Sequence, residues 1–183
     1  QHLFTPLLYQ VATSGLEPGE IAYPVRDIIR GMENVRFLLG NVEHIDRYNQ
    51  TVTVQTNQKS MGIHYDYLIV AAGSQTHYFG MAHIERHAFS LKTLSDAVVL
   101  RNHLLKCFES AAWGEDIEHK TALTTMVVVG GGPTGIETAG ALCELSRYVL
   151  RQEFGPYLNE NAGRVILIAV SYTHLRAHET KAN

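Results

Sequence analysis

Hydrophobic positions along the chain come in short runs that predict an α/β protein. The most informative run is Met126–Val129, which includes three consecutive valines and is typical of a buried parallel strand. A glycine-rich loop follows at once, and apolar residues from Ile136 to Leu150 predict a helix. A second apolar run at 164–169 predicts another strand, so strand, glycine turn, helix and strand make one right-handed parallel unit.

Residues before this unit are predicted to mix short helices with β structure. Pro6 is suited to open a short helix through Ala12, and a second helix is expected from Pro24 to Gly31. Glycine and proline between the two helices are expected to break the chain. Period-2 alternation and short apolar runs predict strands at 35–39, 42–45, 51–54 and 61–64.

A continuous apolar run at 67–73, closing on a glycine, is predicted to be a central parallel strand with ligand space at its carboxyl end. Residues 75–92 are predicted to be loop. Thr93 followed by Asp96 resembles a capping box and predicts a helix to about Ala112. The charged stretch 114–120 is then the natural linker and domain boundary.

The glycine loop fits G-x-G-x-x-G in the strand–turn–helix context that dinucleotide binding requires. Gly130 permits the tight turn, Gly132 lets a pyrophosphate approach the backbone, and Gly135 lets helix and strand pack closely. Pro133 and Thr134 complete the first helical turn, where free N–H groups and the positive helix end favour phosphates. The alternative is a glycine-rich loop in some other α/β protein.

Composition narrows the function classes. The chain of 183 residues is 45% hydrophobic with a net charge of −3, which gives no basic surface for nucleic acid. Its two cysteines form no C-x-x-C, so a dithiol redox pair is not expected, and no apolar run reaches membrane-spanning length. His83 and His87 have helical ligand spacing, but no metal site is expected because no third ligand is near in sequence. No signal peptide is recognised, and because the chain begins with Gln1 rather than Met, we expect the natural N-terminus to lie upstream.

Four segments together resemble the type II NADH dehydrogenases, which are single-subunit, non-proton-pumping NADH:quinone oxidoreductases. The resemblance runs over about residues 2–168 and is carried by 2–13, 65–73, 91–94 and 127–140. It implies an α/β fold with two Rossmann-like dinucleotide-binding domains, for FAD and NAD(P), both incomplete in this chain. The expected division is a partial FAD domain at 1–115, the first half of the NADH domain at 120–170, and a tail at 171–183.

The resemblance also implies a role for individual residues. Pro6, Leu7 and Gln10 are expected along the flavin, and Val42 at its adenine through the backbone. Ala72 and Gly73 correspond to the turn of the second FAD motif, where threonine is commoner than Ala72. Glu137 is expected where nicotinamide and flavin stack, and it is the candidate catalytic residue. The alternative for Glu137 is a solvated glutamate stabilised by the helix dipole.

This sequence also departs from the family. The family's first FAD glycine loop would precede residue 1, and its later flavin segment, quinone pocket and C-terminal membrane helices have no counterpart here. Ala169 stands at the position where an acidic residue holds the NADH ribose. The tail at 171–183 resembles a translated sequencing adapter and is expected to be foreign or disordered, so Ala169 is not an indication of NADPH use.

The predicted function is electron transfer from NADH through FAD to a membrane quinone. We expect this activity in a longer protein that contains the chain, and we expect the chain alone to be inactive. NADH and quinone are the implied substrates. A peripheral position on the cytoplasmic face of the membrane and a homodimer are implied for the longer protein. The alternatives are a ferredoxin or sulfide:quinone reductase of the same fold, and a non-catalytic nucleotide-binding protein that resembles apoptosis-inducing factor.

Overall fold

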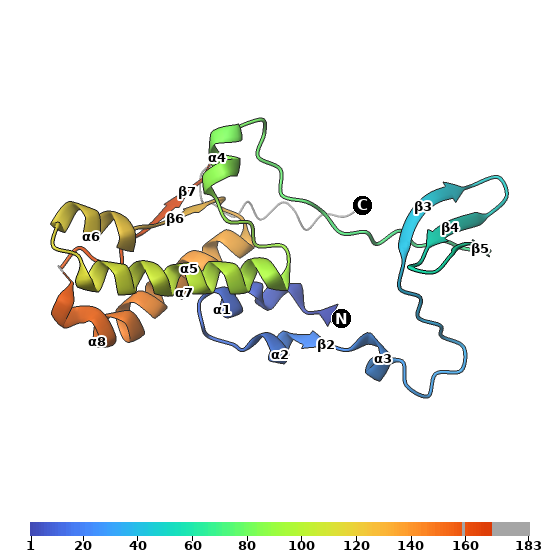
Figure 1. Cartoon of the computed structure of the whole chain (residues 1–183), viewed down its shortest axis with the longest axis horizontal. Coiled ribbons are helices and arrows are strands. Elements are labelled where there is room, and N and C mark those ends of the chain that lie inside the picture. The colour runs from blue at the N-terminus through green and yellow to red at the C-terminus, as the bar shows by residue number, and fades with distance from the viewer. Residues whose placement is uncertain (159, 170–183) are drawn as a thin grey trace, which may run out of the picture. The chain divides into compact units, whose positions relative to one another are not determined.

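The protein is described from a computed structural model, and the structure describes residues 1–158 and 160–169 (Figure 1). Contacts divide the chain into two compact units. The smaller unit is Pro24–Gln75 with Gln1, and the larger unit is His2–Tyr23 with the described residues from Thr76 onward. The tail predicted at 171–183 lies outside the described residues, and the predicted domain division stays a prediction.

The smaller unit contains an antiparallel sheet in the order β3 (Asn41–Asp46), β4 (Thr51–Gln55) and β5 (Ser60–His64). The central strand β4 buries Val52 and Val54, as its alternating sequence requires. These three strands confirm the predictions at 42–45, 51–54 and 61–64. The helix expected from residue 24 to 31 is present but shorter, as α3 (Val25–Ile28).

Two strand predictions in this unit are wrong. Neither 35–39 nor 67–73 forms a strand, and Tyr67 and Ile69 are 94% and 90% exposed. Both runs have the apolar composition of a strand, but a strand needs a neighbour to accept its backbone hydrogen bonds. Within the described residues, no segment pairs with either run.

The N-terminal part of the larger unit packs helices against one another. β1 (His2–Leu3) pairs with β2 (Ala22–Tyr23), and between them lie η1 (Thr5–Leu7), α1 (Leu8–Ala12) and α2 (Pro18–Ile21). The helix predicted at 6–12 is confirmed as η1 followed by α1. The expected break after Ala12 is present, but a short helix that the sequence did not predict, α2, follows it. Pro18 is favourable in the first turn of this helix, and Glu17 with Glu20 forms its capping box.

The longest helix of the described chain, α5 (Leu94–Trp113), begins where its sequence predicts. The Thr93 hydroxyl accepts from the Asp96 amide at 3.1 Å, and the Asp96 carboxylate accepts from the Thr93 amide at 2.9 Å. α5 buries Ala97 against Leu8, Val11 and Ala12 of α1. This contact joins the N-terminal segment to the rest of the larger unit.

Two further helices occupy segments predicted as loop and linker. α4 (Ala82–His87) lies inside the predicted loop 75–92. α6 (Ile117–Thr124) begins within the predicted linker 114–120, because the Asp116 carboxylate accepts from the amides of Glu118 and His119 at 3.1 and 3.3 Å. The linker is therefore shorter than predicted.

The C-terminal part is the parallel unit that the hydrophobic pattern predicts. β6 (Met126–Val129) and β7 (Val165–Ile168) pair in parallel, joined by α7 (Pro133–Glu144), a π-helical segment η2 (Leu145–Leu150), α8 (Arg151–Phe154) and η3 (Gly155–Tyr157) (Figure 1). The register of this pair aligns Met126 with Val165 and Val129 with Ile168. The carboxyl ends of both strands therefore meet beside the glycine loop.

The π-helical segment is a departure from the single α-helix predicted at 136–150. Leu145 and Leu150 are five residues apart, yet both are buried in one cluster with Phe108 and Leu142. A five-residue spacing returns to the same face in a π-helix but not in an α-helix. Beside them the Ser146 hydroxyl donates to the Gly163 carbonyl at 2.9 Å, which fastens the approach to β7.

Candidate functional site

Three glycines of the turn between β6 and α7, at 130, 131 and 135, cannot be replaced without strain or collision. Gly130 has φ +123°, a conformation that L side chains rarely adopt, and its N–H donates to the Ile168 carbonyl at 2.8 Å. A Cβ added to Gly135 would overlap the Gly130 carbonyl oxygen. A Cβ on Gly131 would lie 2.8 Å from the Ala169 side chain. The loop is therefore pressed against the ends of both strands.

Gly132 occupies a different environment, at the open side of the loop. It is the N-cap of α7, and a Cβ added there would have no atom within 4 Å. Pro133 follows at the first helical position, and within the described residues no side chain caps this end. The backbone N–H groups of Thr134 and Gly135 thus have no acceptor inside the helix. Open space beside free amides at a helix N-terminus suits an anionic group such as a phosphate.

Thr138 stabilises the first turn of α7 through a side-chain hydrogen bond. It is buried, and its hydroxyl donates to the Thr134 carbonyl at 2.6 Å. The neighbouring Glu137 is exposed, and within the described residues its carboxylate takes part in no ion pair or hydrogen bond. Its carboxylate is therefore available at the surface of α7.

A cavity of about 560 Å³ lies between the α1 region and α7 and brings two of the predicted site residues together. Gln10 lines it from α1 and Glu137 from α7. The Gln10 side-chain amide donates to the Tyr9 hydroxyl at 3.2 Å, which orients the amide. The full lining is Tyr9, Gln10, Thr13, Ser14, Gly15, Glu137, Gly140, Ala141, Glu144, Leu145, Tyr148 and Val149.

Sequence reasoning missed several members of this lining. Glu144 and Tyr148 follow Glu137 at helical spacings of seven and eleven residues, so the pattern of α7 contained a signal for them. Tyr9 carried no such signal, because its position depends on how α1 packs against α5 and α7. The cavity therefore carries a second carboxylate and two tyrosines beyond the residues that were predicted.

The remaining predicted flavin residues are not among those that line this cavity. Pro6 is exposed and Leu7 half-buried in η1 of the larger unit. Val42 is 60% exposed on β3, and Ala72 and Gly73 lie in the irregular segment of the smaller unit. Gly73 has φ +76°, as a glycine turn requires. Because these residues divide between two units, their roles at a flavin stay predictions.

The two histidines of α4 and the two cysteines are not among the residues that line the cavity between α1 and α7. In α4, the His87 Nδ1 lies 2.8 Å from the His83 carbonyl, so this ring contacts its own helix backbone. Among residues 1–158 and 160–169, no three potential ligands gather as a metal site. Cys107 and Cys143 are free thiols, and burial raises the pKa of Cys107, which lowers its reactivity.

Comparison with known proteins settles the family. The sequence family "Pyridine nucleotide-disulphide oxidoreductase" matches residues 1–181. The chain belongs to this family. It is 44% identical over 167 residues to the type II NADH:quinone oxidoreductase Ndh of Mycobacterium tuberculosis, covering 91% of this chain and 36% of the relative. It is 35% identical over 158 residues to the external alternative NADH-ubiquinone oxidoreductase of Yarrowia lipolytica mitochondria, covering 82% of this chain and 27% of that relative.

Solved structures support the same fold. NDH2 from Plasmodium falciparum, solved in complex with NADH, matches with a TM-score of 0.76 at 21% identity, over 90% of this chain and 34% of that one. The resemblance to type II NADH dehydrogenases and the Rossmann-like α/β fold class are thereby confirmed. The chain spans about a third of the length of the first curated relatives, at 36% and 35%.

Proposed function

We propose that this chain is part of an oxidoreductase that transfers electrons from NADH through FAD to a membrane quinone. The observation that carries the proposal is the glycine turn at 130–135, which leaves an open, uncapped helix N-terminus beside the ends of two parallel strands. The similarity to NADH:quinone oxidoreductases from two organisms supports the choice of substrates. The activity belongs to the longer protein.

The residues of the loop fit the pyrophosphate of NADH. Gly132 offers a backbone with no side chain in the way, and the amides of Thr134 and Gly135 point out of the first turn. Two negative charges there are favoured by the positive end of α7. Gly130 and Gly135 act indirectly, by allowing the close strand–helix packing that aims these amides.

The cavity between α1 and α7 fits the region where nicotinamide and flavin meet in the proposal. When bound, a flavin supplies the hydride acceptor that links a two-electron donor to a quinone. Gln10 would hold the flavin edge from α1 with an amide already oriented by Tyr9. Glu137 would orient the nicotinamide carboxamide and adjust the field around the transferring hydride without moving a proton.

The alternative reductases and the non-catalytic binding protein are less well supported. The relatives reported above are NADH:quinone oxidoreductases, whereas a ferredoxin- or sulfide-linked activity has no comparable support. For the longer protein we also propose peripheral attachment to the cytoplasmic face of the membrane, and a homodimer. In the part of the chain that the structure describes, every helix is too short or too polar to cross a bilayer.

A chimeric enzyme tests the proposal. Residues of this chain replace the 167 matching residues of Mycobacterium tuberculosis Ndh, and NADH oxidation is followed with a soluble quinone. We expect a flavin-containing enzyme that turns over. A chimera that folds and binds flavin but does not oxidise NADH would contradict the proposed function.

Glu137→Gln in that chimera isolates the candidate catalytic residue. Flavin content should not change, because the substitution keeps the size of an exposed side chain. The rate of flavin bleaching at saturating NADH, measured by stopped flow, should fall roughly tenfold, which corresponds to about 1.4 kcal/mol of barrier. Glu85→Gln, in α4 and outside the cavity, is the matched control. Equal bleaching rates in the Glu137 variant and the control would reduce Glu137 to a helix-dipole residue.

A further inference from the structure

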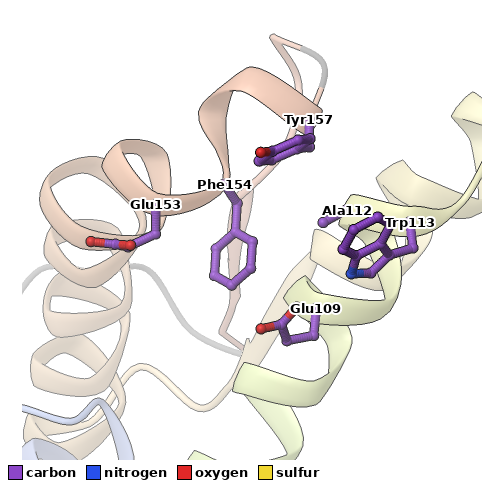
Figure 2. Close-up of a pocket in the computed structure, with 6 residues that line it drawn as sticks. All are labelled: Glu109, Ala112, Trp113, Glu153, Phe154 and Tyr157. Atoms are coloured by element: carbon purple, nitrogen blue, oxygen red, sulfur yellow. The ribbon is translucent and has the colours of Figure 1, made fainter.

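A second pocket, separate from the glycine loop and the α1–α7 cavity, lies where α5 meets α8 and η3. It has a volume of about 260 Å³ and is lined by Glu109, Ala112 and Trp113 of α5, Glu153 and Phe154 of α8, and Tyr157 of η3. Figure 2 shows Glu109 and Trp113 on one side of the gap and Phe154 and Tyr157 on the other, with the Glu153 carboxylate directed away from it. We call it the aromatic–carboxylate pocket. All of it belongs to the larger unit.

Two large aromatic rings stand at the mouth of this pocket. Trp113 is 83% exposed and Tyr157 58% exposed, and their ring planes lie within 23° of parallel with centroids 6.4 Å apart. Phe154, below them, is half-buried and approaches Phe108 of the core at 6.1 Å. The two rings therefore stack on each other and stay largely exposed, on a base anchored in the hydrophobic core, and exposed aromatic residues are enriched at binding surfaces.

The carboxylates of the pocket have no cation of their own. In the portion of the chain described, the carboxylates of Glu109 and Glu153 take part in no ion pair or hydrogen bond. Lys120, from α6, donates instead to the Tyr157 backbone carbonyl at 2.8 Å. This bond holds η3 in place and directs the ammonium to a carbonyl. The Glu109 carboxylate therefore faces a gap that it shares with two stacked and exposed aromatic rings.

We propose that this pocket binds the guanidinium group of an arginine side chain in a segment of a partner protein. A guanidinium is planar, so it can stack on Trp113 or Tyr157 while its N–H fork donates to a carboxylate. An ammonium is a strongly hydrated point charge and gains less from the rings. The pocket volume lies below the 300–1,000 Å³ or so of drug-sized ligand sites, which suits one side chain rather than a nucleotide.

Trp113 makes the test direct, because it is the one tryptophan of the 183-residue chain. Its fluorescence is titrated with N-acetyl-arginine amide, which represents an arginine within a peptide. The matched probes are N-acetyl-citrulline amide, which keeps the shape without the charge, and free arginine, whose own carboxylate is repelled by the two glutamates. We expect saturable quenching by the arginine amide and roughly tenfold weaker binding of the citrulline probe.

Substitutions in the pocket assign the binding. Glu109→Gln should weaken the arginine amide at least threefold, and Glu153→Gln should weaken it less, because its carboxylate is directed away from the gap. Glu118→Gln, on α6 outside the pocket, should leave binding unchanged. All three variants keep Trp113 as the reporter, and far-UV circular dichroism checks that they fold. Citrulline binding equal to arginine, or indifference to both substitutions, would overturn the proposal. Tighter binding of tetramethylammonium than of the arginine amide would overturn it too, in favour of a lipid-headgroup site.

Discussion

Gly135→Ala is predicted to destabilise the larger unit, because the smallest possible side chain has no room there. The added Cβ would overlap the Gly130 carbonyl oxygen and lie 3.0 Å from its carbonyl carbon. Both atoms are backbone at the end of β6, so they cannot turn aside as a flexible side chain would. Overpacking of this kind costs about 3 kcal/mol at the upper end of its usual range. Alanine returns about 1 kcal/mol through helix propensity, which leaves a net loss of about 2 kcal/mol.

Gly140→Ala is the matched control for this prediction. Gly140 lies in the same helix, and a Cβ added to it has no atom within 4 Å. The same chemical change should therefore stabilise the unit by up to about 1 kcal/mol. The two variants should differ by about 3 kcal/mol in the free energy of unfolding.

Urea unfolding of the 183-residue chain, followed by Trp113 fluorescence, measures both variants in the unit that contains α7. With a slope of about 2 kcal/mol per molar urea, Gly135→Ala should lower the midpoint by about 1 M and Gly140→Ala raise it by about 0.5 M. If Gly135→Ala unfolds at the wild-type midpoint, the strand and helix are packed loosely enough around the loop to accept a side chain at this position.

Three further predictions concern single interactions. Gly132→Val in the chimeric enzyme should raise the NADH Michaelis constant without loss of flavin, because a branched side chain fills the open space beside the loop; an unchanged constant would place NADH elsewhere. Ser146→Ala should cost about 1 kcal/mol in thermal unfolding, since it leaves the Gly163 carbonyl without its donor. Partial burial opposes the ionisation of Asp96, but hydrogen bonds from the amides of Lys92 and Thr93 outweigh it and hold its pKa below the ordinary value. The ionised carboxylate therefore stabilises the fold above about pH 4, and this contribution is lost as the pH falls further. Asp96→Asn should accordingly be less stable than wild type at pH 7, with the difference shrinking on acidification in a denaturation series.

Local signals in the sequence were sufficient for the parallel unit and for the start of α5. The valine run, the glycine spacing and the Thr93–Asp96 capping box each act over a few residues, and each element appears where its signal stands. The π-helical segment had no such signal, since only the burial of both Leu145 and Leu150 against Phe108 favours a five-residue spacing. That burial is a property of the packed core.

The predictions that were wrong also concern features that depend on contacts between distant segments rather than on local sequence. The run at 67–73 has the composition of a strand, but a strand forms only where a neighbouring strand can pair with it. The sequence of the run does not specify that neighbour. Among site residues, the family resemblance predicts Gln10 and Glu137, and both line one cavity. Tyr9 and the aromatic–carboxylate pocket depend on contacts between helices far apart in sequence, which no local pattern encodes.

The exposed apolar run has a consequence for the behaviour of the chain in solution. Residues 67–72 are Tyr-Leu-Ile-Val-Ala-Ala, which combine high β propensity with no charge and no proline. Their backbone lies outside any sheet, and Tyr67, Ile69 and Val70 are largely exposed. Segments of this composition form intermolecular β ladders and seed aggregation. Asp66, directly before the run, is placed as a gatekeeper charge, and a lysine introduced at Ile69 would add a second one within the run.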